Sequence, residues 1–437
     1  MKQRNSLTAI ILVMIFAVCF ITGCGSDSNN ITSSTNTFLD NSFDSMIGEG
    51  DLQVPGLGVI VFKNGGIVYE YFSGLRNIDK ALPLEKNTRL RAASVSKMFT
   101  MFGIMQLVED GKIDLDEDVS NYLGFTLRNT NFPDEKITVR MLASHTSTLR
   151  DGDNYSLPPS KSIQEFFRPE GSEYNNGIHF AEQDKTFFTY CNLNYGILGT
   201  IIEKVSGERF DLYQKNHVLK PMGINADYVV GNLSSEDFSN LGTLYRKQNG
   251  KWTAQADDYE SQPPQNTAWN ENLNDYVIGT NATAFSPQGG LRISFAELGN
   301  CLEMMINGGN FRGTRIISEA SFNEMCRPQW IYNPDVKNGD TYDVMYIYGL
   351  GLYQIEGSGK ARLCEKYDID FTGHSGDAYG LISGVYFRPG TKDGVIFMVN
   401  GTGVEAGIDE RSAGRFSNGY IWEEEIMNPV CGQFFTD

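Results

Sequence analysis

The chain has 437 residues, of which 41% are hydrophobic and 12% aromatic, a composition that excludes a disordered or fibrous protein. Its 54 acidic and 36 basic residues give a formal net charge of −18, which disfavours binding to nucleic acids and to anionic lipid. The length would fit two or three domains, although one sheet with a large helical insertion would also account for it.

The first 23 residues have the pattern of a secretory signal peptide. Lys2 and Arg4 precede an apolar run over 9–20, which is shorter than the roughly 20 residues of a membrane-spanning helix. The sequence Ile-Thr-Gly-Cys at 21–24 resembles a bacterial lipobox, in which Cys24 becomes the lipidated first residue; an ordinary signal peptide with an incidental cysteine is the alternative. Residues 24–38 are polar and predict a flexible tether. We therefore expect an exported protein, lipid-anchored to the bacterial cell envelope.

Several elements follow in chain order. Two β-rich runs around Asn64-Gly65, within 58–72, predict a hairpin. Helical spacing of apolar residues predicts helices over 97–110, 195–206 and 296–306, and the first of these stops before Gly111. A second hairpin is expected from 381–387 and 395–400, and the stretch 409–427 has a helical tendency despite Gly414 and Gly419.

Strands at both ends with helices between them predict an α+β fold. We expect one domain over 39–437, in which an antiparallel sheet is built from about 40–93 and 285–437. The intervening segment, about 94–284, forms a mostly helical inserted part.

Cysteine and histidine patterns give no support for a metal site or a cofactor. Five cysteines follow the tether without a C-x-x-C pair, and the four histidines lack H-E-x-x-H spacing. The odd number opposes a complete disulfide framework; one or two bridges stay open, and buried thiols are favoured. The five are Cys191, Cys301, Cys326, Cys364 and Cys431.

The strongest chemical signal is the S-x-x-K sequence from Ser94 to Lys97, at the start of the first predicted helix. A serine hydroxyl needs a base within hydrogen-bond reach to act as a nucleophile, and positions i and i+3 share a helix face. Alone, the tetrapeptide is weak evidence for a catalytic serine, because an N-cap serine followed by a surface lysine has the same pattern.

Two further motifs strengthen this interpretation. A Y-x-N at 190–192 and an H-x-G at 374–376 follow the S-x-x-K in an order that resembles the penicillin-recognising serine hydrolases. This family includes class C β-lactamases, D-Ala-D-Ala carboxypeptidases, D-aminopeptidases and related esterases. The resemblance extends from Pro55 to about Gly401 and implies a β-lactamase/transpeptidase-like fold.

The resemblance also implies roles for the catalytic residues. Ser94 would attack an acyl carbonyl and become the acyl-enzyme, with Lys97 beneath it taking or stabilising the proton. Tyr190 would relay the proton to the leaving group and activate the incoming acceptor. A tyrosine, whose ordinary pKa is about 10, can transfer protons in this way near neutral pH only with help from a neighbouring ammonium. The ammonium of Lys97 would favour the phenolate of Tyr190 or share its proton.

Substrate-binding residues are implied in the same way. Asn192 would orient Lys97, and the backbone N–H groups of Ser94 and Asp377 would form an oxyanion hole. His374, which begins the segment His374-Ser375-Gly376, stands where many β-lactamases carry a lysine and would donate to a substrate carboxylate.

Five other residues near these motifs are given structural roles. His145 lies in a segment that is structural in the family, and Thr148 replaces the family's usual glycine, which suggests an altered turn. Cys191 is favoured as structural, with pocket lining as the alternative. His179 and His217 are expected on the surface or in packing.

These motifs predict a serine hydrolase that cleaves an amide or ester of a small-molecule or peptide acyl substrate. An acyltransferase, in which an alcohol or amine intercepts the acyl-enzyme, is one alternative. A non-catalytic penicillin-binding-like envelope scaffold is another, although intact Ser94, Lys97 and Tyr190 oppose it. The oligomeric state is not predicted.

Overall fold

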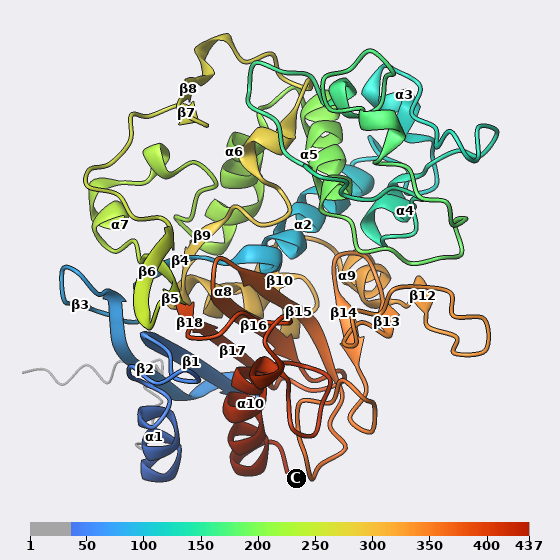
Figure 1. Ribbon diagram of the computed structural model, residues 1–437. Helices are drawn as coiled ribbons and strands as arrows, with labels where there is room; N and C mark the ends of the chain where they lie inside the picture. Colours follow the sequence, from blue (N-terminus) through green and yellow to red (C-terminus); the bar gives the residue numbers. More distant parts are fainter. Residues whose placement is uncertain (1–35, 437) are drawn as a thin grey trace, which may run out of the picture. The chain divides into compact units, whose positions relative to one another are not determined.

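A nine-stranded antiparallel sheet organises the described residues, 36–436, of the computed structural model (Figure 1). Its order is β12-β13-β14-β15-β16-β17-β1-β2-β3, so β17 pairs with β1 and joins strands from the two ends of the chain. The α+β class is confirmed. The strands are β1 (Gly56–Lys63), β2 (Gly66–Asn77), β3 (Leu82–Pro83), β12 (Trp330–Ile331), β13 (Ile347–Tyr348), β14 (Tyr353–Ile355), β15 (Phe371–Ala378), β16 (Leu381–Phe387) and β17 (Gly394–Val399).

Both predicted hairpins are present. Asn64 and Gly65 connect β1 to β2 with φ of 53° and 84°, the left-handed backbone that a two-residue hairpin turn of this type requires. β16 and β17 pair directly, as expected from their sequences.

The central strands separate two hydrophobic cores because their side chains alternate between the two faces. Val59 and Val61 face one core together with α1 and α10, whereas Ile60 and Phe62 face the other, with α2, α5 and α8 (Figure 1). The main helices are α1 (Thr37–Asp44), α2 (Ser96–Glu109), α5 (Asn192–Ser206), α8 (Phe295–Ile306) and α10 (Ile421–Phe434).

A short two-stranded sheet leads into α2. β4 (Arg89–Arg91) pairs with β9 (Arg292–Ser294), and the chain then passes through the 3-10 turn η1 (Ala93–Val95) into α2. The predicted helices at 97–110 and 296–306 are confirmed, and the one at 195–206 starts earlier, at Asn192.

The prediction for the C-terminal segment was wrong over 409–420. The last helix, α10, begins only at Ile421, because the preceding backbone is folded into a closed loop. The N–H of Gly414 donates to the carbonyl of Gly419, and the carboxylate of Glu424 accepts backbone N–H groups from Arg415, Phe416 and Ser417.

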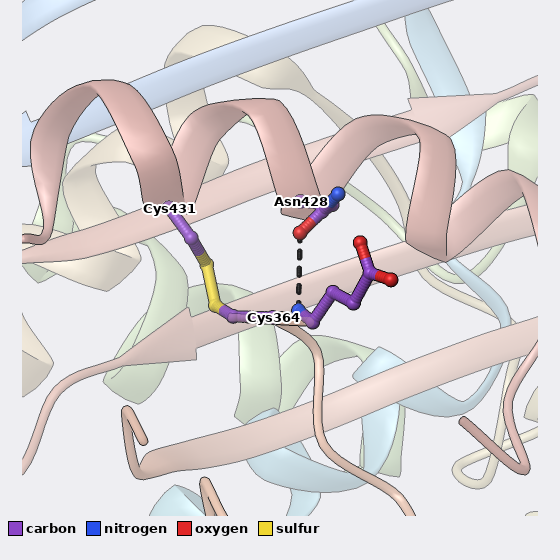
Figure 2. The surroundings of a disulfide bond; sticks show 4 residues. Cys364, Asn428 and Cys431 are labelled. Atoms are coloured by element: carbon purple, nitrogen blue, oxygen red, sulfur yellow. Dashed lines mark hydrogen bonds between the residues drawn. A yellow bond between two sulfur atoms is a disulfide. The ribbon is translucent and has the colours of Figure 1, made fainter. Parts of the chain in front are cut away.

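One disulfide joins Cys364 to Cys431 of α10, with a Cα–Cα distance of 6.1 Å (Figure 2). The adjacent N–H of Glu365 donates to Asn428 Oδ1 at 3.0 Å. From the sequence, one or two disulfides are possible, but no pair is assigned. The other three cysteines that follow the tether are free. Cys191 and Cys301 are buried thiols, as favoured from the sequence, and Cys326 is half-buried.

The signal peptide, Cys24 and the tether up to residue 35 lie outside the described residues. α1 begins at Thr37, in the last residues of the predicted tether, and Asn36 caps it. Within 36–436, none of the helices has the length and apolar character needed to cross a membrane.

Candidate active site

Ser94 lies in the turn η1, directly before α2, and Lys97 lies in the first turn of that helix. The ammonium nitrogen Nζ of Lys97 is 3.0 Å from Ser94 Oγ, so the i, i+3 contact predicted by the S-x-x-K sequence is formed. Ala93, next to Ser94, has a φ of 47°, a backbone conformation that is strained for a residue with a side chain. The strained turn places the hydroxyl of Ser94 at the start of the helix, above the buried lysine.

Lys97 is completely buried and surrounded by uncharged acceptors. Besides Ser94, its Nζ donates to Asn192 Oδ1 at 2.8 Å and to the carbonyl of Gln288 at 3.1 Å. Burial lowers the pKa of Lys97 to about 7, and the charge of Asp151 partly opposes this shift. Near neutral pH a large fraction of the side chain is therefore an amine that can accept a proton from Ser94.

Asp151 determines how Asn192 faces Lys97. One carboxylate oxygen of Asp151 accepts from Asn192 Nδ2 at 2.8 Å, and the other accepts from the N–H of Leu193 at 2.9 Å. The amide oxygen of Asn192 is thereby turned toward Lys97. The sequence analysis missed Asp151, because a helix cap supplied from outside the local sequence leaves no capping pattern.

Tyr190 stands beside this pair. Lys97 Nζ lies 4.6 Å from the centre of the Tyr190 ring, and the ring of His145 packs against the ring of Tyr190 with centroids 4.4 Å apart. Burial raises the pKa of Tyr190 well above its usual value, while a hydrogen bond with Ser94 acts in the opposite direction. The resting side chain is therefore a neutral phenol, which differs from the phenolate form considered from the sequence.

His374 belongs to a buried chain of hydrogen bonds. The N–H of Cys191 donates to His145 Nδ1 at 3.0 Å, His145 Nε2 donates to the Tyr348 hydroxyl at 3.2 Å, and that hydroxyl donates to His374 Nε2 at 3.1 Å. His374 Nδ1 then donates to the carbonyl of Ser375 at 2.5 Å. Carbonyl and amide partners at the two ends fix these directions.

This arrangement leaves His374 uncharged. Burial, followed by the nearby charge of Lys97, lowers the pKa of His374 to about 3. Both ring nitrogens already have partners within the protein, so the expected donation to a substrate carboxylate does not agree with the observed geometry. His145, which was excluded from the site, instead packs directly against Tyr190.

The strand β15 brings His374, Ser375, Gly376 and Asp377 past the nucleophile turn. A Cβ on Gly376 would lie 2.5 Å from the carbonyl oxygen of Ala92, so the strand can approach this closely only without a side chain. The carboxylate of Asp377 accepts from the Tyr420 hydroxyl at 2.8 Å. The oxyanion hole formed by the N–H groups of Ser94 and Asp377 stays a prediction.

Thr148 has a left-handed backbone conformation, which is uncommon for a residue with a branched side chain. Its φ is 63°, the left-handed region, and its carbonyl accepts from Asn129 Nδ2 at 2.9 Å. The altered turn expected from this substitution stays a prediction.

Two hollows meet at Ser94, Tyr190 and Asp377. The arginine lobe, about 670 Å³, is also lined by Arg91, Tyr155, Tyr259, Trp269, Arg292 and Tyr379. The acidic lobe, about 620 Å³, is also lined by Asp343, Tyr353, Asp409, Glu410, Tyr420 and Glu423. A substrate can therefore extend to either side of the nucleophile. Across 36–436, no group of three His, Cys, Asp or Glu side chains is arranged to hold a metal ion.

Comparison with known proteins identifies the family of this chain. The family model described as Beta-lactamase matches residues 43–416. The chain belongs to the beta-lactamase family. Membership supports a serine-based hydrolytic or acyl-transfer enzyme without specifying the reaction.

Individual known proteins are similar to this chain at low sequence identity. Protein flp from Staphylococcus aureus is 28% identical over 183 residues, which cover 40% of this chain and only 35% of that protein. The octameric penicillin-binding protein homologue from Pyrococcus abyssi has a TM-score of 0.60 at 24% identity, over 84% of this chain and 73% of that one.

The D-amino acid amidase from Ochrobactrum anthropi SV3, complexed with L-phenylalanine, has a TM-score of 0.59 at 19% identity. The match covers 85% of this chain and 93% of that one. These structural similarities confirm the expected β-lactamase/transpeptidase-like fold.

Proposed function

We propose that this protein is a serine hydrolase that forms an acyl-enzyme on Ser94 and cleaves an amide or ester. The observation that carries the proposal is the contact of 3.0 Å between Ser94 Oγ and Lys97 Nζ, together with the pKa of about 7 for Lys97. A base with a pKa near the working pH is well suited to proton transfer. Family membership supports the same chemistry.

In the acylation step, neutral Lys97 takes the proton of Ser94 while Oγ forms a bond to the acyl carbon. The phenol of Tyr190 gives its proton to the departing amine or alcohol as the bond to the leaving group breaks. The proton held by Lys97 then restores Tyr190. In deacylation, water attacks the acyl carbon and gives a proton to the Lys97–Tyr190 pair. The bond between the acyl carbon and Ser94 Oγ then breaks, and the pair returns the proton to Oγ.

A D-amino-acid peptide or amide is the first substrate to examine, followed by a β-lactam and a small ester. The similarity to a fold that includes a D-amino acid amidase supports this order. An acyltransferase would follow the same acylation step and differ only in the acceptor, so transfer products with added alcohols or amines distinguish the two reactions.

Covalent labelling tests this function. A fluorophosphonate probe should label the wild type on Ser94, and Ser94→Ala should abolish labelling, whereas Ser235→Ala, which removes an exposed serine on α7 (Ser235–Ser239), should not. Tyr190→Phe should slow substrate turnover by about 10²–10⁴-fold and affect labelling less, because it removes a proton donor and not the nucleophile. An unlabelled wild type would favour the non-catalytic scaffold.

We also propose that the protein is exported and lipid-anchored through Cys24. The disulfide between Cys364 and Cys431 supports export, since disulfides persist in oxidising compartments. Cys24→Ala should move the protein from the membrane fraction to the soluble fraction while hydrolytic activity is unchanged. Unaltered membrane association in that variant would refute the anchor.

A further inference from the structure

The arginine lobe contains a pair of like charges. Arg91 on β4 lies directly opposite Arg292 on β9 in the strand register, and both side chains line the lobe. Like charges at directly opposed positions on neighbouring strands are unfavourable unless other groups compensate them.

Asp257 compensates chiefly one of the two arginines. Its carboxylate accepts from Arg292 Nε at 3.2 Å and from Arg292 Nη2 at 2.8 Å, and Arg292 Nη1 donates to the carbonyls of Tyr228 and Gly290. Arg91 Nε is 3.7 Å from the same carboxylate, which is an ion pair without a hydrogen bond. The guanidinium of Arg91 is thus the less compensated of the two.

Arg91 is also available to a ligand. Its side chain is 18% exposed, and its guanidinium makes no hydrogen bond among the described residues; because Nε is itself buried, a ligand would be bound through the terminal N–H groups. The guanidinium carbon lies 5.4 Å from the centre of the Tyr379 ring, which limits its position on one side. Since Arg91 precedes Ser94 by one short turn and shares its lobe, a group bound there is close to the nucleophile.

The carboxylates of this lobe are occupied or lie at its edge. Asp153 is exposed and accepts from Asn175 Nδ2 at 3.0 Å, while Asp377 accepts from Tyr420, which lines the acidic lobe. Neither carboxylate makes an ion pair with Arg91 in the described structure.

The acidic lobe has the opposite character. The carboxylates of Asp343, Asp409, Glu410 and Glu423 line it, and its described lining contains no lysine or arginine. A negatively charged part of a substrate would be repelled there and attracted to the other side of Ser94.

We propose that Arg91 forms an anion subsite beside Ser94 that binds a carboxylate of the substrate in the arginine lobe. The inference rests on the proposed hydrolase function and specifies its substrate class: acyl compounds that carry a free carboxylate a few bonds from the scissile ester or amide. A guanidinium suits this task because its N–H groups match the two oxygens of a carboxylate.

Matched chromogenic esters test the subsite. The mono-4-nitrophenyl esters of succinate and glutarate carry a carboxylate, and 4-nitrophenyl acetate does not. In Arg91→Gln, kcat/KM for the better carboxylated ester should fall about 10- to 100-fold, as expected for the loss of a hydrogen bond to a charged group. The value for the acetate ester should change less than about twofold, and Arg91→Lys should lie between wild type and Arg91→Gln for the carboxylated ester.

The matched control is Arg312→Gln, which removes the same charge from an exposed arginine paired with Glu303. It should leave both esters unchanged. Equal losses on charged and neutral esters in Arg91→Gln would overturn the subsite. Unchanged values of kcat/KM for both esters would overturn it as well.

Two measurements keep the inference independent of the hydrolase function and of the stability of the variant. Glutarate should bind the wild type more tightly than Arg91→Gln in calorimetry, a readout that requires no turnover; equal binding would refute the subsite. If Arg91→Gln does not fold, added salt should lower kcat/KM of the wild type for the carboxylated ester selectively, and equal salt effects on both esters would refute it. Failure of Ser94 labelling, in contrast, contradicts the hydrolase function and leaves the glutarate comparison decisive for the subsite.

Discussion

Lys97 is the residue whose surroundings most directly determine the chemistry of the site. Its three acceptors are uncharged, and the carboxylate of Asp151 reaches it only through Asn192. Burial without a directly paired carboxylate is the physical reason that its pKa is about 7 and not near the usual value for lysine.

The rate of Ser94 labelling should therefore depend on pH through Lys97. Below the pKa of about 7 the ammonium cannot accept the proton of Ser94, and above it the amine can. The rate should rise about tenfold between roughly pH 6 and pH 8 and then level off, as expected for a single base. In Lys97→Met this rise should disappear along with most of the labelling, whereas a pH-independent wild type would exclude Lys97 as the base.

Asp151→Asn should shift that profile to lower pH. The negative charge of Asp151 raises the pKa of Lys97, so its removal lowers this pKa further. The neutral amide also no longer fixes the orientation of Asn192, and kcat should fall by about 10-fold or more. Asp153→Asn, a change of the same charge at an exposed position of the same loop, is the control and should leave the midpoint in place.

Among the elements, the position of β15 depends on the absence of a side chain at Gly376. Gly376→Ala would place a Cβ 2.4 Å from Ser383 Oγ and 2.5 Å from the Ala92 carbonyl, which forces β15 away from the turn that holds Ser94. We expect labelling of Ser94 to fall by about 10²-fold, because small displacements of catalytic groups are costly.

Gly299→Ala on α8 is the matched control for that change. Its added Cβ would meet only the Phe62 ring at 3.8 Å, and alanine is the better helix former by about 1 kcal/mol. Thermal melts should show equal or higher stability for Gly299→Ala with full labelling. Normal labelling in Gly376→Ala would show that the close approach of β15 is dispensable.

Elements with local signals were predictable, and elements held by distant contacts were not. The hairpin turn at Asn64-Gly65 and the α2 helix have local patterns, and the motifs at Ser94 and Tyr190 could be recognised because their order resembles that of a known family. Asp151 and His145 contribute through contacts with residues more than 40 positions away, which no sequence period encodes. The loop before α10 was mispredicted because the carboxylate of Glu424, from within the helix, closes it.

At the level of the whole molecule, the disulfide closes a long loop. Cys364 and Cys431 are 67 residues apart, and the bridge attaches α10 to the segment that follows β14. Chain entropy predicts a stabilisation of about 4 kcal/mol for a loop of this length, and measured values for native bridges are typically about 2–4 kcal/mol.

Reduction should therefore lower the free energy of unfolding by about 2–4 kcal/mol without removing the active site, since neither cysteine contacts Ser94 or Lys97. Urea titration with and without dithiothreitol measures the difference. The double variant Cys364→Ala/Cys431→Ala should match the reduced wild type and show no further response to the reductant. A reductant effect of equal size in the double variant would show that the loss of stability does not come from this disulfide.

The pairing of β1 with β17 at the centre of the sheet also constrains the order of folding in time. Val59 and Phe397 are register partners, so the innermost strand pair cannot form until almost all of the chain has been synthesised. Until then the β1–β2 hairpin has an unpaired edge and one uncovered apolar face. A growing chain of this topology cannot complete its central sheet until β17 emerges, and a chaperone has that interval in which to act.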